Sequence, residues 1–139
     1  KVARSNEDVY FYIETADKIS DPSDEAWMRL LIDTDRNKST GWEGYDYIIN
    51  RTVSGAKATL EKSNKDWKWT KAGTVDYAVS GNKMEIRIPK SLLHIENKVN
   101  IEFKWSDNMQ NEGDIMDFYV NGDVAPGGRF NYLFSEVNE

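Results

Sequence analysis

Hydrophobic and polar side chains alternate along most of this chain, which is the pattern of β-strands. Val9, Phe11 and Ile13, for example, are separated by Tyr10 and Tyr12. A period of two places alternate side chains on opposite faces of an extended strand. On this pattern we expect strands at residues 9–13, 27–32, 45–50, 58–62, 66–71, 75–80, 83–88, 99–106, 118–120 and 129–135.

Turn residues divide the expected strands and indicate how they pair. The sequence SGNK at 80–83 combines glycine and asparagine, which tolerate the positive φ of a tight hairpin turn, so the flanking strands should pair. One short helix is expected at 90–93, because Pro89 presets its first turn. About ten short strands separated by turns predict an all-β fold, an antiparallel β-sandwich of two sheets that is Ig-like or jelly-roll-like.

The composition fits a single folded domain over residues 1–139. Hydrophobic residues make up 39% of the chain and aromatic residues 12%, which excludes general disorder. The chain has no cysteine, so disulfides, zinc–thiolate sites and thiol catalysis are excluded. Because it starts at Lys1 and not at Met, we expect it to be a piece excised from a larger protein.

The charge of the chain limits its partners. The net charge is −6 and the pI is near 4.9, with no cluster of basic residues to offset it. Such a surface repels a phosphate backbone, so nucleic acid is not an expected partner. No apolar run is long enough for a membrane span.

An acidic loop at residues 33–46 lies between two strongly β-type segments. Asp33, Asp35 and Asn37 recur at every second position, a spacing that lets a curling backbone aim several oxygen ligands at one calcium ion. A helix-flanked calcium loop has glycine and glutamate where this loop has Lys38 and Gly44. The alternative is a polar hairpin loop whose Asp and Asn side chains cap their own turns. Both interpretations remain open.

The five tryptophans fall into two groups. Trp27 and Trp105 lie within strongly apolar strands and are expected in the core. Trp42, Trp67 and Trp69 have polar neighbours, which makes them either aromatic platforms for a sugar ring or core residues at one end of the fold.

Two further loops are conspicuous. In the segment 123–130, Gly127 and Gly128 allow a tight structural turn before the last strand, with Asp123 expected to pair with Arg129. The acidic loop at 17–24, with Asp17, Asp21 and Asp24, is expected to be solvated.

Motifs for catalysis are absent from the sequence. There is no glycine-rich phosphate loop, zinc signature or nucleophile elbow. The single histidine, His94, lies next to the expected helix and is expected to pack there. The chain is therefore not expected to be an enzyme.

The order of the strands and loops resembles a known family. The segments VYFYIET at 9–15, WMRLLIDTD at 27–35 and YDYIIN at 45–50 occur in the order found in family 9 carbohydrate-binding modules and the wider DOMON-like sandwiches. MEIRIP at 84–89 is similar to their strand that ends in proline and a short helix. FKWSDN at 103–108 is similar to their penultimate region. The resemblance covers most of the chain.

This resemblance implies a function and a set of polar contacts. Sugar-binding members have a Glu at the position of Arg29 and an Arg-x-Asn motif where this chain has Ile48 and Asn50. Because adjacent strands place side chains a few Å apart, Arg29 could replace the missing arginine of this motif. Together with Asn50 and Asn108 it would bind sugar hydroxyl groups beside the tryptophans, with calcium stiffening the loops. The resemblance implies a non-catalytic module of a secreted glycan-degrading enzyme, extracellular or periplasmic, that binds an oligo- or polysaccharide and is covalently linked to a catalytic domain.

Two alternatives to sugar binding remain. One is a calcium-stabilised structural or interaction module without a sugar site. The other is the haem-binding branch of the DOMON-like sandwiches, in which Met84 and His94 would have to converge as axial ligands.

Overall fold

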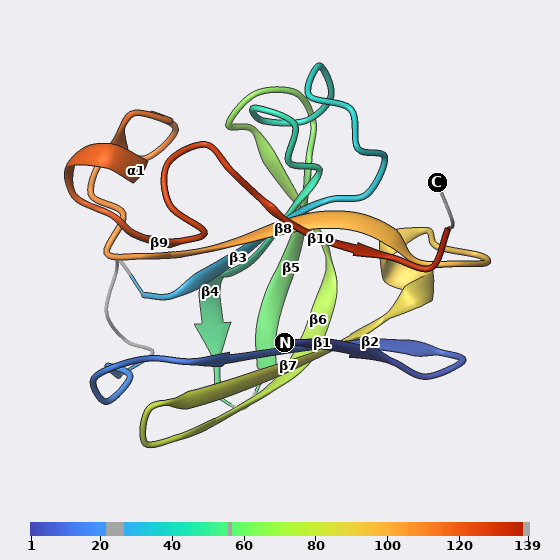
Figure 1. Cartoon of the computed structure of the whole chain (residues 1–139), viewed down its shortest axis with the longest axis horizontal. Coiled ribbons are helices and arrows are strands. Elements are labelled where there is room, and N and C mark those ends of the chain that lie inside the picture. The colour runs from blue at the N-terminus through green and yellow to red at the C-terminus, as the bar shows by residue number, and fades with distance from the viewer. Residues whose placement is uncertain (22–26, 56, 138–139) are drawn as a thin grey trace.

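Antiparallel strands account for most of the chain in the computed structural model, which describes residues 1–21, 27–55 and 57–137 (Figure 1). Strand makes up 50% of the structure and helix 6%. The strands are β1 (Val2–Arg4), β2 (Asp8–Glu14), β3 (Arg29–Asp33), β4 (Tyr47–Ser54), β5 (Lys57–Ser63), β6 (Trp69–Ser80), β7 (Lys83–Pro89), β8 (Asn100–Asp107), β9 (Asp123–Ala125) and β10 (Tyr132–Ser135). The helical segments are the 3₁₀-helix η1 (Lys90–Leu93) and α1 (Asp117–Val120).

Hydrogen bonds join the described strands into one continuous antiparallel sheet. Its order is β1-β2-β7-β6-β5-β4-β3-β8-β10, and β9 pairs with β8. The sheet curls, so that β1, β2 and β7 lie along one side of the molecule and β8 and β10 along the other, with β3 to β6 between them (Figure 1). The expectation of an all-β, antiparallel fold is confirmed, in the form of a single curled sheet.

The inner face of the curl holds the main core, here called the inner core. Val9 and Phe11 of β2 have no exposed surface, and Phe11 pairs with Ile86 on β7. Across the interior, the ring of Phe11 contacts that of Phe103 edge-on, with centroids 5.3 Å apart. Burying a side chain of this size stabilises the folded state by about 1.5–3 kcal/mol. The predicted period of two therefore places the expected side chains in this core.

The outer face of the sheet carries a second hydrophobic cluster, here called the outer cluster. Leu31 of β3 and Ile48 of β4 pair with each other and point away from the inner core. Loops lie over them and add buried side chains. The buried members of the outer cluster are Leu31, Trp42, Tyr45, Ile48, Met109 and Phe118. Strands with bulky side chains on both faces need such a cover, because neither face can be left in water.

The local turn predictions hold in most places. Ser80 pairs with Lys83 across the expected hairpin, and Gly81 has a φ of 61°. The expected helix after Pro89 is η1. The expected strands at 66–71 and 75–80 meet in one long strand, β6, which begins only at Trp69 and continues through Gly73 opposite a register shift in β5. Residues 66–68 lie before this strand.

The prediction of a strand at 118–120 is wrong. This segment belongs to α1, with local backbone bonds such as Phe118 N to Ile115 O at 3.2 Å. The Asp117 carboxylate accepts hydrogen bonds from the amides of Gln110 and Asn111, which folds the preceding loop around it. Conversely, the short strand β9 forms where a loop was expected. Asp24 of the 17–24 loop lies outside the described residues.

Candidate functional site

Three carboxylates converge where β3 ends and β4 begins. Asp33, Asp35 and Asp46 each offer an oxygen, and these oxygens lie within 4.8 Å of one another. The loop between the strands returns Asp46 to this point, because its backbone N–H donates to the carbonyl of Ile32 at 2.8 Å. Carboxylate oxygens grouped in this way are the ligand type that calcium prefers.

Asp33 is the buried member of this group. Its side chain has no exposed surface, and its Oδ1 accepts no hydrogen bond from a described residue. Its Oδ2 lies 3.3 Å from Nζ of Lys38. Burial, and next the neighbouring Asp35 carboxyl, raise the pKa of Asp33 to about 6, against the opposing effect of Lys38. A divalent cation would relieve this unfavourable concentration of negative charge.

The prediction of Asn37 as a metal ligand is not supported by this geometry. Its Oδ1 accepts the backbone N–H of Ser39 at 2.9 Å, and its own N–H donates to Asp35 at 2.9 Å. Asn37 therefore caps the turn, which is the alternative that the sequence left open. Asp46 takes the third position. The sequence pattern does not indicate Asp46 as a metal ligand, because Asp46 is the polar residue between Tyr45 and Tyr47 at the start of an expected strand.

Trp42 is buried, which corrects its prediction as an exposed platform. Only 3% of its surface is exposed, and its Nε1 donates to the carbonyl of Gly113 at 3.3 Å. Reciprocal backbone bonds between Trp42 and Tyr45, at 2.9 and 2.8 Å, form a turn that folds both rings onto the outer cluster. A ring in this position has no free face for a sugar.

Trp67 and Trp69 are half-buried against the same cluster. Trp67 meets Trp42 edge-on at 4.5 Å between centroids, and Trp69 meets Trp67 edge-on at 5.3 Å. Gly113 packs so tightly on Trp67 that a Cβ there would lie 2.9 Å from the ring. These tryptophans hold the covering loops together and are not a flat, open platform.

The three predicted polar contacts do not come together. Arg29 is 2% exposed on the outer face, where its guanidinium lies 2.5 Å from Glu112. Asn50 is also buried, but its amide contacts the sulfur of Met84 in the inner core at 3.6 Å. A φ of 72° at Asn50, next to a register shift in β4, turns it to the opposite face of the sheet. Asn108 alone is exposed.

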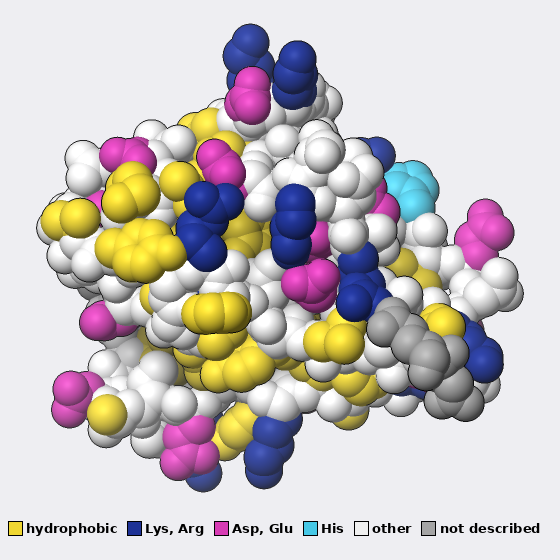
Figure 2. All heavy atoms as spheres, turned by 45° about the horizontal axis from the view of Figure 1, so that its top comes forward, with side chains coloured by type: hydrophobic (Ala, Val, Ile, Leu, Met, Phe, Trp, Pro, Cys, Tyr) yellow, Lys and Arg dark blue, Asp and Glu magenta, His cyan; other side chains and the backbone are white. Residues whose placement is uncertain are grey.

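Exposed aromatic rings occur instead near the C-terminal end of the described chain. The exposed fractions are 55% for Tyr119, 79% for Phe130 and 46% for Tyr132. In Figure 2, hydrophobic side chains gather on the surface over α1 and the β9–β10 segment, with charged side chains between them. The sequence pattern does not indicate these residues as a binding surface, because Tyr119 and Phe130 fall within expected strands.

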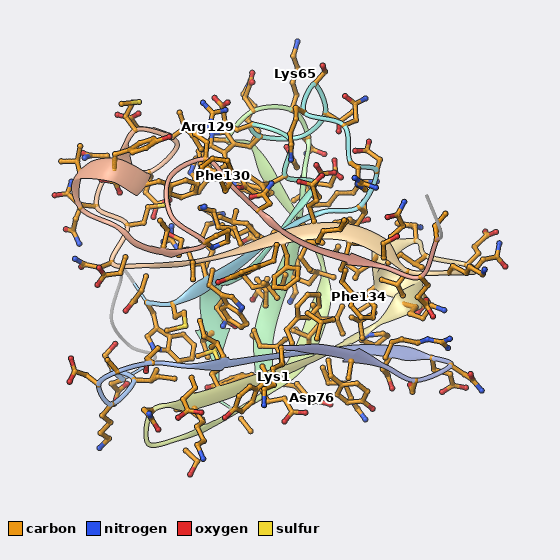
Figure 3. The ribbon with its side chains drawn as sticks, viewed as in Figure 1. Lys1, Lys65, Asp76, Arg129, Phe130 and Phe134 are labelled. Carbon is orange, nitrogen blue, oxygen red and sulfur yellow. The ribbon has the colours of Figure 1, made fainter. Side chains whose placement is uncertain are left out.

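The neighbourhood of Phe130 is built by a tight loop. Arg129 and Phe130 lie at its outer end, between β9 and β10 (Figure 3). Gly128 has a φ of 59°, and a Cβ there would lie 3.2 Å from the ring of Tyr119, so loop and ring are in contact. Arg129 pairs with Glu43 at 3.0 Å, and not with Asp123 as the sequence suggested.

Asn131 completes the polar side of this neighbourhood. Its amide lies 2.6 Å from the hydroxyl of Tyr45. Burial raises the pKa of Tyr45 far above its ordinary value, so this hydroxyl stays protonated and able to donate. Phe130 thus lies in the chain between Arg129, which pairs with Glu43, and Asn131, whose amide contacts the hydroxyl of Tyr45.

Comparison with known protein families, curated proteins and solved structures finds no significant match to this chain.

The structure does not favour haem binding by Met84 and His94. Met84 has no exposed surface and packs in the inner core, where its sulfur receives the amide of Asn50. His94 is exposed at the end of η1, with a φ of 55°.

Two grooves run along the open seam of the curled sheet, between β2 on one side and β8 and β9 on the other. Their volumes are about 500 and 460 Å³, and both are lined by Ile13, Glu14, Trp105 and Ala125. None of the site residues expected from the sequence lines either groove. Among the helices of the described residues, none is long and apolar enough to cross a membrane.

Proposed function

We propose that this domain is a non-catalytic carbohydrate-binding module, and that its binding surface is formed by Tyr119, Phe130 and Tyr132. The observation that carries the proposal is the ring of Phe130, which is 79% exposed on a loop that its neighbours hold in place. Exposed hydrophobic side chains that gather in one patch are typical of a binding surface, and the exposed ring of Tyr119 contacts the same loop at Gly128.

The chemistry around Phe130 suits a sugar. The C–H face of a sugar ring packs on a flat aromatic ring, and its hydroxyl groups need donors and acceptors close by. Arg129 and Glu43 supply both, in an ion pair whose side chains are 52% and 39% exposed. Asn131, the next residue in the chain, adds an amide. These groups replace Arg29 and Asn50 as the proposed polar contacts.

The wider proposal follows the resemblance to family 9 carbohydrate-binding modules. The domain would be part of a secreted glycan-degrading protein, extracellular or periplasmic, and would hold a covalently linked catalytic domain on its oligo- or polysaccharide substrate. The two ends of the curled sheet, which lie opposite each other around one core, would correspond to the two layers of the family's sandwich.

A glycan array, followed by titration of the best oligosaccharide, tests the proposal. Phe130→Ala and Tyr119→Ala should each weaken binding at least about tenfold, which corresponds to about 1.4 kcal/mol. Tyr10→Ala is the matched control, because Tyr10 is a partly exposed ring on β2, along the other side of the molecule (Figure 1). This variant should bind like the wild type.

Two results would reject the proposed surface. If no glycan binds the wild-type domain, the carbohydrate function fails. If a glycan binds equally well to Phe130→Ala and Tyr119→Ala, the function stands but its surface lies elsewhere. Variants of Trp67 and Trp69 would then be the next to examine.

A second candidate function is a calcium-stabilised structural or interaction module, and one observation favours it. The Oδ1 atom of Asp33 is buried without a donor and lies in a group with Asp35 and Asp46. These three residues would hold the ion, whose charge would neutralise theirs. A ligand that binds only the folded state raises the free energy of unfolding by about 2.7 kcal/mol at a hundredfold excess over Kd.

Thermal melts in EDTA and in millimolar calcium test this candidate. The melting temperature should rise with calcium in the wild type and in Asn37→Ala. It should not respond in Asp46→Asn, which removes a carboxylate from the group. A response that depends on Asn37 and not on Asp46 would contradict the assignment of these ligands.

A further inference from the structure

A buried lysine lies directly beneath the loop that carries Phe130. Lys104 is on the outer face of β8, opposite Leu31 of β3, and has no exposed surface. The inward residues of the same strand, Phe103 and Trp105, belong to the inner core. A fully buried lysine is rare, because the charged end of the side chain ordinarily reaches water.

The ammonium group of Lys104 has three N–H donors, and the loop and α1 take them up. Its Nζ lies 2.5 Å from the carbonyl oxygen of Pro126 and 2.7 Å from that of Phe130. It also lies 5.3 Å from the ring centroid of Phe118, a cation–π contact. The two carbonyls belong to the first and last residues of the loop 126–130.

No carboxylate among the described residues forms an ion pair with Lys104. Glu102 on the same face of β8 and Asp33 on β3 both pair with Lys38. Asp117 at the start of α1 is occupied by the backbone amides of its own loop. On two further neighbouring segments, Arg29 pairs with Glu112 and Arg129 pairs with Glu43.

Burial therefore acts on Lys104 without an opposing carboxylate and lowers its pKa to about 8. An apolar side chain of similar size would avoid this desolvation cost. An apolar side chain could not donate the two hydrogen bonds that Lys104 makes to backbone carbonyls. Both of these bonds go to the loop that carries Arg129 and Phe130.

We propose that Lys104 is a positioning residue, which fastens both ends of the loop 126–130 from beneath and so holds Phe130 in place for ligand binding. The part of this inference that concerns ligand binding rests on the proposed carbohydrate-binding function. The fastening of the loop does not, and it is measurable without any ligand.

Trypsin is a suitable probe, because the loop contains a single cleavage site, after Arg129. Cleavage after Lys68, an exposed residue just before β6, is the internal reference. The readout is the ratio of the two cleavage rates in one digest, followed by mass spectrometry. Global unfolding accelerates both cleavages, whereas release of the loop accelerates only the cleavage after Arg129. Arg129→Gln identifies the loop product by its disappearance.

In Lys104→Met the ratio should rise about tenfold or more, because the loop loses both bonds from Lys104. In Lys104→Arg, which keeps a cation and its N–H donors, the ratio should stay closer to that of the wild type. If Lys104→Met does not fold, Lys104→Gln, which keeps an amide donor, takes its place. A ratio that is unchanged in the variants lacking the cation overturns the proposed fastening.

The same variants on the glycan array separate this inference from the proposed function. Weaker binding by Lys104→Met than by Lys104→Arg supports the positioning role. A released loop with unchanged glycan binding overturns the positioning role and leaves the proposed function intact. Absence of binding by the wild type removes the proposed function, and the trypsin ratio alone then decides whether Lys104 fastens the loop.

Discussion

The inner core and the outer cluster cover opposite faces of the same sheet, yet they are built differently. The inner core consists mainly of strand residues such as Phe11, Ile86 and Trp105, whose partners are other strands. The outer cluster takes Trp42 and Phe118 from loops and helical segments that fold over the strands. The inner face of the sheet is thus buried mainly by other strands, and the outer face by loops and a helical segment.

The two regions also differ in buried charge. Arg29, Asp33 and Lys104 are almost fully buried, and all three point to the outer face. Each buried charge costs free energy unless it gains partners. In this molecule the partners are residues of the covering loops, namely Glu112, Lys38 and the loop 126–130. The buried charges of the outer layer therefore fix the positions of loops.

The largest predicted effect concerns the free energy of unfolding that each region contributes. Trp105→Ala in the inner core and Trp42→Ala in the outer cluster should each lower the free energy of unfolding by about 3–5 kcal/mol, since both rings are 3% exposed. Urea unfolding measures this loss. A small loss for Trp42→Ala alone would mean that the outer cluster contributes little to the free energy of unfolding. Trp42 would then again be a candidate for stacking on a sugar.

A smaller effect is expected from the buried charge of Arg29. Glu112→Gln removes the carboxylate of this ion pair from a buried guanidinium and should cost about 2–3 kcal/mol, less than for a fully buried pair because Glu112 is 46% exposed. In an Arg29→Met background the same change should cost little. A double-mutant cycle of urea unfolding measures the difference. Equal costs in both backgrounds would show that the pair does not position the 108–114 loop.

Asp33 makes the stability of the outer layer depend on pH. Its pKa in the folded state, about 6, is above the ordinary value of 3.8, so its protonated form stabilises the fold below pH 4. That contribution is lost as the pH rises through 6. In EDTA, Asp33→Asn should therefore gain stability over the wild type across this range, by roughly 2–3 kcal/mol at pH 7.

Melts of both proteins at several pH values give this difference directly, and they cancel the titration of the carboxyl groups that do not interact with Asp33. Calcium at pH 7 should reverse the order, because only the wild type retains the full set of ligands. A constant difference between the two proteins from pH 4 to pH 7 would contradict the raised pKa.

The smallest effect on stability is expected at the proposed binding surface. Phe130→Ala should change the free energy of unfolding by less than about 0.5 kcal/mol, because the ring is 79% exposed. Phe134→Ala is the matched control, since Phe134 follows in β10 but packs against the inner core. Figure 3 shows the two residues at different places along the same segment, Phe130 on the loop and Phe134 on β10. A large loss for Phe130→Ala would mean that the ring is structural.

Much of the fold follows from the sequence by itself. The alternation around Phe11 predicts β2, the SGNK turn predicts the hairpin of β6 and β7, and Pro89 predicts η1. These features depend on residues a few positions apart, because their physical causes are the period of the side chains and the local φ preferences. The position of Asp33 and Asp35 at the end of a strand is of the same kind.

Only the tertiary structure decided which residues are exposed and which meet. Trp42 and Phe130 both lie in polar, glycine-containing loops, yet one is covered and the other is open. The difference comes from segments distant in sequence, such as Gly113, whose carbonyl accepts the indole N–H of Trp42. Asp46 likewise joins Asp33 because backbone hydrogen bonds between strands bring them together. Burial and convergence are properties of long-range contacts, which no local pattern of residues specifies.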